Sequence, residues 1–243
     1  MNVVLIGVVT GLAGFSVGGV SLDLDHASVT RGAQAVARSA LAVGELVEAR
    51  AREDGRGMHA LSVAIIDAAV GRVTASDPTA GTIDVLGQRV QLGSATRFAP
   101  GLSRERLAAA GPGERFRVSG LRAPDGSVVA TRIERAPSGA AALVGSPPAE
   151  PGPGERFVVE GYVDGDPGSG QFMIDGLEFG IDPGAGDGLA PERLVRVSGR
   201  TLADGRHIIE RAEALPAPFS APAREERVAR PVERPARGEI GGR

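Results

Sequence analysis

Residues 172–179 read Phe-Met-Ile-Asp-Gly-Leu-Glu-Phe, and this stretch decides the fold. Phe172 and Ile174 alternate with Met173, and on the other side of Asp-Gly two apolar residues alternate with Glu178. Alternation with a period of two is the pattern of a strand with one buried face. Asp-Gly tolerates the positive φ angles of a two-residue hairpin turn. The stretch therefore predicts a β-hairpin with one apolar face.

The same pattern recurs twice earlier in the chain. Gly18-Gly19 separates Phe15 and Val17 from the apolar residues that follow. In a second place, we expect a four-residue connection, Leu86-Gly87-Gln88-Arg89, between a strand with Ile83 and Val85 and a strand with Val90 and Leu92. Three further turns, Asp54-Gly55, Asp125-Gly126 and Asp204-Gly205, mark a second hairpin near the end of each copy. Three copies of one strand pattern thus fill most of the chain.

A variable segment lies between the third and fourth strands of each copy. In the second copy, Ser103 can cap a helix, an Ala run favours it and Gly111 can end it. The Ala-rich residues 33–42 occupy the same place in the first copy, and residues 191–193 leave room for one turn in the third. The order β-β-β-short α-β-β predicts an all-β fold of three tandem small OB-like antiparallel barrels. An open five-stranded sheet or a sandwich would give the same order, so barrel closure stays open.

The copies set the domain boundaries. We expect a first barrel at residues 1–67, a second at 68–136, a Pro/Gly linker at 137–154, a third barrel at 155–215 and a tail at 216–243. The prolines of the linker favour an extended connection, so the third barrel should be the more independent one. The tail carries five prolines with interspersed Arg and Glu, a composition typical of a disordered segment.

Composition limits the compartment and the chemistry. The chain has no cysteine, so disulfides and thiol nucleophiles are excluded, and the formal net charge is −3. Residues 1–17 are apolar but lack the basic start of a signal peptide, so we interpret them as a strand. No signal peptide is visible, which leaves a cytoplasmic location open. We expect no transmembrane segment.

Residues that carry chemistry in other proteins are few, and we interpret each of them as structural. His26, His59 and His207 lie in different copies without metal-ligand spacing, so we expect solvated or edge-strand histidines. Residues 164–166 and 182–187 resemble parts of a calcium loop but lack its full pattern. The remaining candidates are Ser119 and Ser198, each before a Gly, and the hexapeptide Gly-Pro-Gly-Glu-Arg-Phe at 111–116 and 152–157. We therefore predict no catalytic, cofactor-binding or metal-binding residues, no cofactor and no enzymatic activity.

Three segments resemble a known family. They are Gly7-Val8-Val9-Thr10-Gly11 followed by Phe15 to Val20, Thr82 to Val90, and Val129-Ala130-Thr131-Arg132-Ile133-Glu134. These segments are similar to the bacterial tandem-repeat family called domain of unknown function 5666, and the resemblance covers roughly residues 3 to 215. The resemblance implies a tandem OB-like β module in periplasmic or other cell-envelope proteins. No catalytic residues are assigned to that family.

Two functions follow. The first is a non-enzymatic binding or structural module of the bacterial cell envelope, whose partner is a protein, a glycan or another envelope component. The alternative is an OB-type binder of single-stranded nucleic acid, which needs a basic groove with stacking aromatic residues. The net charge of −3 and an aromatic content of 3% disfavour nucleic acid. The sequence alone does not identify the ligand.

Overall fold

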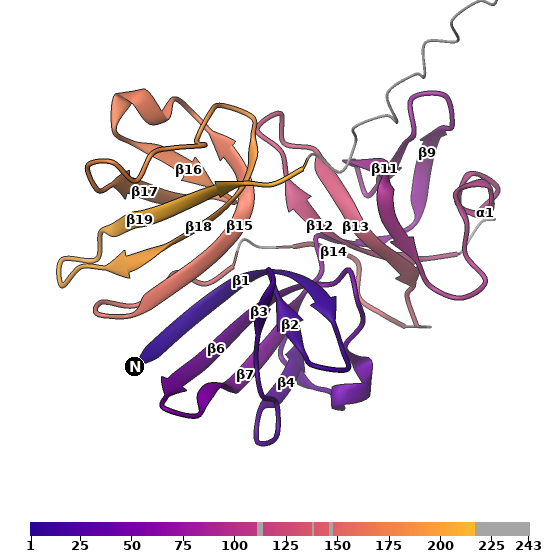
Figure 1. Cartoon of the computed structure of the whole chain (residues 1–243). Coiled ribbons are helices and arrows are strands. Elements are labelled where there is room, and N and C mark those ends of the chain that lie inside the picture. The colour runs from indigo at the N-terminus through magenta and orange to yellow at the C-terminus, as the bar shows by residue number, and fades with distance from the viewer. Residues whose placement is uncertain (111–113, 138, 146–147, 217–243) are drawn as a thin grey trace, which may run out of the picture.

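The computed structural model describes residues 1–110, 114–137, 139–145 and 148–216. Strands dominate, as predicted, and they form three barrel-like units arranged around a common centre (Figure 1). Unit 1 lies within residues 1–67, unit 2 within 68–136 and unit 3 within 155–215. Among the described residues, no helix has the length and apolar character needed to cross a membrane.

Unit 3 is the simplest barrel. Its strands are β15 (Arg156–Asp164), β16 (Phe172–Ile174), β17 (Leu177–Ile181), β18 (Leu194–Thr201) and β19 (His207–Ala214). Strand β15 pairs with β16, β16 with β17, β17 in parallel with β19, β19 with β18, and β18 again with β15. This ring is the closed strand order 1-2-3-5-4-1 of an OB-type barrel. A single-turn 3-10 helix, η2 (Pro167–Ser169), lies between β15 and β16.

Unit 2 has the same order with an interrupted first strand. Its elements are β8 (Ala69–Gly71), β9 (Val73–Asp77), β10 (Thr82–Val85), β11 (Gln88–Phe98), α1 (Arg104–Ala108), β12 (Phe116–Arg122) and β13 (Val128–Arg135). The break at Arg72 lets β8 pair with β12 and β9 with β10. The predicted helix is confirmed as α1. Ser103 caps it as expected, because its side chain accepts a hydrogen bond from the Arg106 backbone N–H at 3.2 Å. Its expected end at Gly111 lies outside the described residues.

Unit 1 departs from the prediction between its third and fourth strands. Its elements are β1 (Asn2–Gly11), β2 (Ser16–Val17), β3 (Val20–Ser21), β4 (Ser28–Arg31), β5 (Gln34–Ala35), the 3-10 helix η1 (Arg38–Ala40), β6 (Leu46–Asp54) and β7 (Gly57–Ile66). The expected helix at 33–42 is reduced to the single 3-10 turn η1, and β5 occupies the start of this range. Gly32 has a φ of 57° and turns the chain into a β4–β5 hairpin, so strand pairing overrides the helix preference of the alanines.

The predicted hairpin turns form, with one correction. Asp175 and Gly176 have φ angles of 52° and 84°, as the two-residue turn requires. The connection between β10 and β11 is also a two-residue turn, Leu86-Gly87, and not four residues, because Gln88 pairs with Val85. Leu86 takes a φ of 53°, which leucine rarely adopts. Its side chain packs over Gly71, where an added Cβ would lie 2.4 Å from the Leu86 Cγ.

Strand β1 joins two barrels, so the expected independence of unit 3 is wrong. It pairs antiparallel with β6 of unit 1 and parallel with β15 of unit 3 (Figure 1). Val3 and Leu5 pack in the core of unit 1, whereas Val4 and Ile6 pack in the core of unit 3. A strand buried on both faces reads as a continuous apolar run. This explains the apolar N-terminus and confirms its interpretation as a strand.

The linker is also held against the barrels. Within it, β14 (Leu143–Val144) adds to the edge of β8, and the Ala149 backbone N–H donates to Glu48 Oε2 at 3.0 Å. The three units meet in one apolar cluster, formed by Leu46, Leu121, Val129, Tyr162 and Leu194. The predicted disordered tail, residues 216–243, lies outside the described residues from 217 onward.

Candidate functional site

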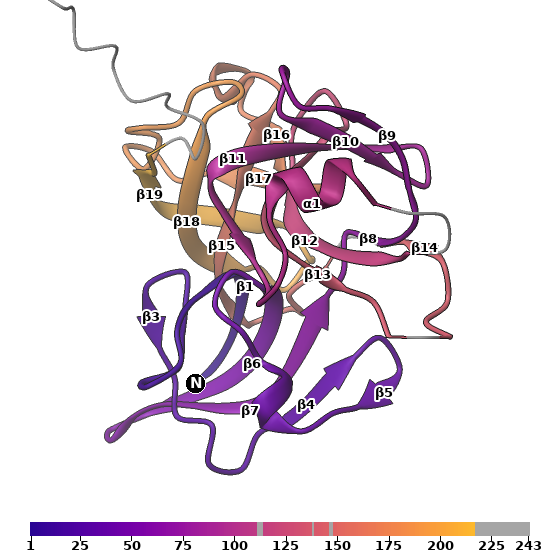
Figure 2. The ribbon, with the colours of Figure 1, turned by 90° about the vertical axis from the view of Figure 1, so that its right-hand side faces the viewer.

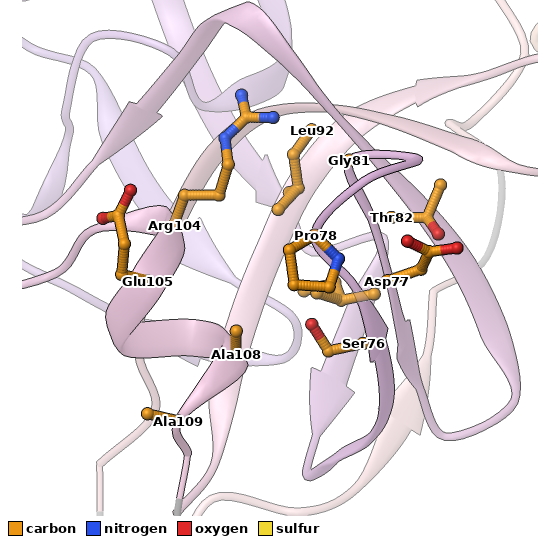
Figure 3. Close-up of a pocket in the computed structure, with 11 residues that line it drawn as sticks. Ser76, Asp77, Pro78, Gly81, Thr82, Leu92, Arg104, Glu105, Ala108 and Ala109 are labelled. Carbon is orange, nitrogen blue, oxygen red and sulfur yellow. The ribbon is translucent and has the colours of Figure 1, made fainter.

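One recess lies in unit 2, between α1 and the β9–β10 hairpin (Figure 3). It has a volume of about 460 Å³. Ser76, Asp77 and Thr82 come from the hairpin on one side, and Arg104 and Ala108 come from the helix on the other. We call it the α1 pocket.

Local hydrogen bonds fix both walls of the α1 pocket. Asp77 Oδ1 accepts the backbone N–H groups of Thr79 and Ala80, each at 2.9 Å, which holds the hairpin tip. Arg104 Nη2 donates to the Gly93 carbonyl oxygen at 3.0 Å and ties the helix to β11. An added Cβ at Gly81 would lie 3.1 Å from Arg104 Nη1, so a glycine lets the two walls approach. The pocket is therefore built into the fold.

The chemistry of the α1 pocket is that of a binding site. Ile83 and Leu92 are buried beneath it, and Ala108 and Ala109 add small apolar side chains from the helix. The polar rim includes Glu105, whose own backbone N–H and the Ser103 side chain lower its pKa. An apolar floor with a polar rim suits an apolar group of a ligand. The lining residues contain no nucleophile paired with a general base.

The second recess lies in unit 3, has a volume of about 450 Å³ and is lined by His207. The imidazole is 6% exposed and lies between Phe157 and Phe179, with ring-centroid distances of 5.9 and 5.7 Å. His207 Nδ1 forms a hydrogen bond with Thr201 Oγ1 at 2.9 Å. Burial lowers the pKa of His207, while the charge of Glu150 raises it. The effect of burial is the larger one, so the pKa of His207 lies below its ordinary value.

The third recess is a groove between units 1 and 2, with a volume of about 1010 Å³. Figure 2 shows β4 and β5 of unit 1 below β8 of unit 2 and β14 of the linker. Arg31 forms ion pairs with Glu45 and, at 2.6 Å, with Asp67, and Arg117 approaches Asp67 at 3.5 Å. Burial lowers the pKa of Arg31, but the two carboxylates more than offset this and raise it. The buried charges are paired with one another, so they join the two units.

The structure keeps the three predicted histidines apart. His26 lies in a turn of unit 1, and His59 on β7 lies 3.2 Å from Asp23 Oδ2 and 3.3 Å from Asp54 Oδ1. His207 is buried, where we expected a solvated or edge-strand histidine. Within the described ranges, no three His, Asp or Glu side chains are grouped to hold a metal ion.

A family model described as "Domain of unknown function (DUF5666)" matches residues 6–63 and 70–134. The chain belongs to this family. Searches of curated proteins and of solved structures gave no match. Unit 3 has the strand order of the two matched DUF5666 repeats, although its strand β15 also pairs with β1.

The recurrent motifs of the DUF5666 repeats are structural. Ser119-Gly120 and Ser198-Gly199 form β-bulges against β13 and β19. An added Cβ at Gly199 would lie 1.9 Å from the Ile208 carbonyl oxygen, so the bulge requires glycine there. Asp166 caps η2 by accepting the Gly168 N–H. The second hexapeptide copy turns at Gly154, with a φ of 79°, and leads into β15.

The sequence pattern does not predict the α1 pocket. The alanines near 108 indicate only a helix. Small side chains on the helix face that meets the hairpin are also what keeps the pocket open, and this face is known only once the hairpin is placed. His207 was noted, but its burial depends on Phe157 and Phe179, which come from two other strands.

Proposed function

We propose that this protein is a non-enzymatic binding module of the bacterial cell envelope, and that the α1 pocket receives an apolar side chain of a protein partner. The observation that carries the proposal is the pocket itself, an apolar recess with two preformed walls and a polar rim. A preformed site loses little conformational entropy when a ligand binds. The periplasmic or envelope location rests on the family resemblance.

Single-stranded nucleic acid is the second candidate, and the OB strand order favours it. The side chains that line the recesses do not favour nucleic-acid binding. Among the lining residues of the three recesses, Phe179 is the one Phe, Tyr or Trp, and it is 1% exposed. Bases stack on exposed aromatic rings in sites of this kind. A protein partner is therefore the better proposal.

The test is site-specific photo-crosslinking in cells that produce the protein from its natural gene. A photoreactive residue at position 76 lines the α1 pocket, and one at position 61 is a control on β7, where Leu61 is 51% exposed. We expect one discrete protein adduct from position 76, recovered in the envelope fraction. Equal adducts from both positions, or no adduct from position 76, would contradict the proposal.

A blocking variant tests the pocket directly. Ala108→Arg places a long side chain in the α1 pocket at an exposed helical position, where arginine is a good helix former. It should reduce the adduct from position 76 at least ~10-fold, the effect of losing about 1.4 kcal/mol of binding. The matched control, Ala35→Arg on the exposed β5, should leave the adduct unchanged.

A further inference from the structure

We infer that the recess beside His207 in unit 3 is a separate binding site for an oligosaccharide. The recess lies between the connection from β15 to β16 and the hairpin from β18 to β19, and β17 forms its floor. In OB-type barrels, the corresponding face and loops bind oligonucleotides and oligosaccharides. The position alone leaves both ligand classes open, and the side chains decide between them.

The charge of the lining residues disfavours a nucleic acid as the ligand of this recess. The acidic lining residues are Glu150, Glu178 and Asp204, and the one arginine is Arg206, whose Nε lies 2.8 Å from Asp204 Oδ2. A recess with this excess of carboxylates repels phosphate groups. A neutral, hydroxyl-rich ligand has no such penalty.

Planar polar groups then supply the hydrogen bonds that a sugar needs. Gln171 Nε2 donates to Glu178 Oε1 at 2.9 Å, so a carboxylate and an amide stand side by side at one wall. At the other wall, the Asp204 carboxylate, a hydrogen-bond acceptor, lies next to the N–H donors of the Arg206 guanidinium. Hydroxyl groups both donate and accept hydrogen bonds, so neighbouring sugar hydroxyls match such mixed pairs. Gly180 and Ile208 add an apolar patch for the C–H face of a sugar ring.

His207 is the anchor of the proposed site. Its Nδ1 is held by Thr201, and the ring is fixed between two phenylalanines. Among the described residues, the hydrogen bond of the ring is made by Nδ1, and the small exposed part of His207 lines the recess. An imidazole has two ring nitrogens that can form hydrogen bonds, so Nε2 is left for a partner in the recess. A sugar hydroxyl can provide that partner.

The test is a titration followed by NMR of the histidine rings. The chain has three histidines, so His26 and His59 serve as internal controls for His207. The probes are chitotetraose, cellotetraose and maltotetraose, with dodecathymidylate and spermidine as competitors of other chemistry. We expect at least one tetrasaccharide to shift the His207 signals and to leave those of His26 and His59 in place. The inference is overturned if no tetrasaccharide shifts His207, or if dodecathymidylate or spermidine binds there more tightly.

Variants separate a site from a nonspecific effect. Gln171→Ala and Glu178→Ala remove exposed side chains, so the barrel should stay folded. Each should weaken tetrasaccharide binding about 10-fold, because each removes a side chain that forms a hydrogen bond with a sugar hydroxyl. Glu53→Ala, an exposed glutamate on β6 of unit 1, is the matched control and should bind as tightly as the parent protein. Equal affinity in all three variants would also overturn the inference. Because the α1 pocket lies in unit 2, a negative result here leaves the proposed function untouched.

Discussion

At the scale of single residues, Asp175 combines a turn role with a buried charge. It occupies the tight turn between β16 and β17, is 6% exposed, and its Oδ2 has no partner among the described residues. It lies beside Gly120 and Arg122 of unit 2, in a small void where the units meet. Burial raises the pKa of Asp175 to about 6, although the backbone N–H and charge of Arg122 lower it. The ionised carboxylate therefore destabilises the folded protein at neutral pH.

Asp175→Asn should stabilise the protein at pH 7.5 and have little effect near pH 4. The folded pKa of about 6 lies above the ordinary value of 3.8, so the parent protein loses stability as pH rises from about 4 to about 6. The full shift sets an upper limit of about 3 kcal/mol for the gain. Asparagine also tolerates the positive φ. Urea unfolding at both pH values measures the change.

Asp125→Asn is the control of opposite sign. Asp125 occupies a similar Asp-Gly turn, but its carboxylate accepts hydrogen bonds from Ser127, which lower its pKa. Its substitution should therefore cost stability at pH 7.5. An Asp175→Asn protein that is less stable than the parent at pH 7.5 would show that the carboxylate has a stabilising partner.

Single residues also show which turns the sequence can predict. The dipeptides Asp-Gly and Gly-Gly favour positive φ angles, so the sequence predicts the turns at 175–176 and 18–19 with the right length. Leu86 carries no such signal, because its positive φ depends on packing over Gly71 across the barrel. The turn after β10 was therefore predicted two residues too long.

At the scale of elements, strand β1 couples units 1 and 3. Glu160 on β15 adds a polar link between the two units. Its Oε2 accepts a hydrogen bond from the Val8 N–H of β1 at 3.0 Å, and its Oε1 forms an ion pair with Arg196 of β18 at 2.8 Å. Gly7 and Gly18 approach Glu160 so closely that an added Cβ would lie 2.8 and 3.0 Å from it. Unfolding of unit 3 should therefore remove contacts from unit 1.

Gly176→Val tests this coupling. Valine is strained at a φ of 84°, so the change should destabilise unit 3 by roughly 1 to 3 kcal/mol. Amide hydrogen exchange should accelerate in β16 and β17 and also in β1, while β10 and β11 of unit 2 keep their protection. Gly32→Val imposes similar strain in the β4–β5 hairpin at a sheet edge, so its effect should stay local. Unchanged protection of β1 in Gly176→Val would show that the units unfold separately.

At the scale of the whole molecule, the repeat predicted the barrels but not their assembly. Alternating apolar residues and turn glycines act within one copy, so the strand order of each barrel follows from local sequence. The parallel pairing of Val4 with Phe157 joins residues of units 1 and 3 that lie far apart in the sequence, and no short sequence pattern predicts it. The α1 pocket and the recess beside His207 likewise need contacts between elements that are separate in sequence.

The charge and surface of the whole molecule predict weak binding to nucleic acid. With a net charge of −3 and no exposed aromatic side chain lining the recesses of the described residues, binding to mixed-sequence single-stranded DNA or RNA should be no tighter than about 10 µM at physiological salt. Fluorescence anisotropy at several salt concentrations measures it, on the full chain and on a chain that ends at Leu215. The longer chain adds six arginines after that residue, so weak salt-dependent binding by it alone would come from this segment. Tight binding by the shorter chain would place a nucleic-acid site on the barrels, because that chain lacks the arginine-containing segment after Leu215. That result would make the nucleic-acid candidate the better proposal.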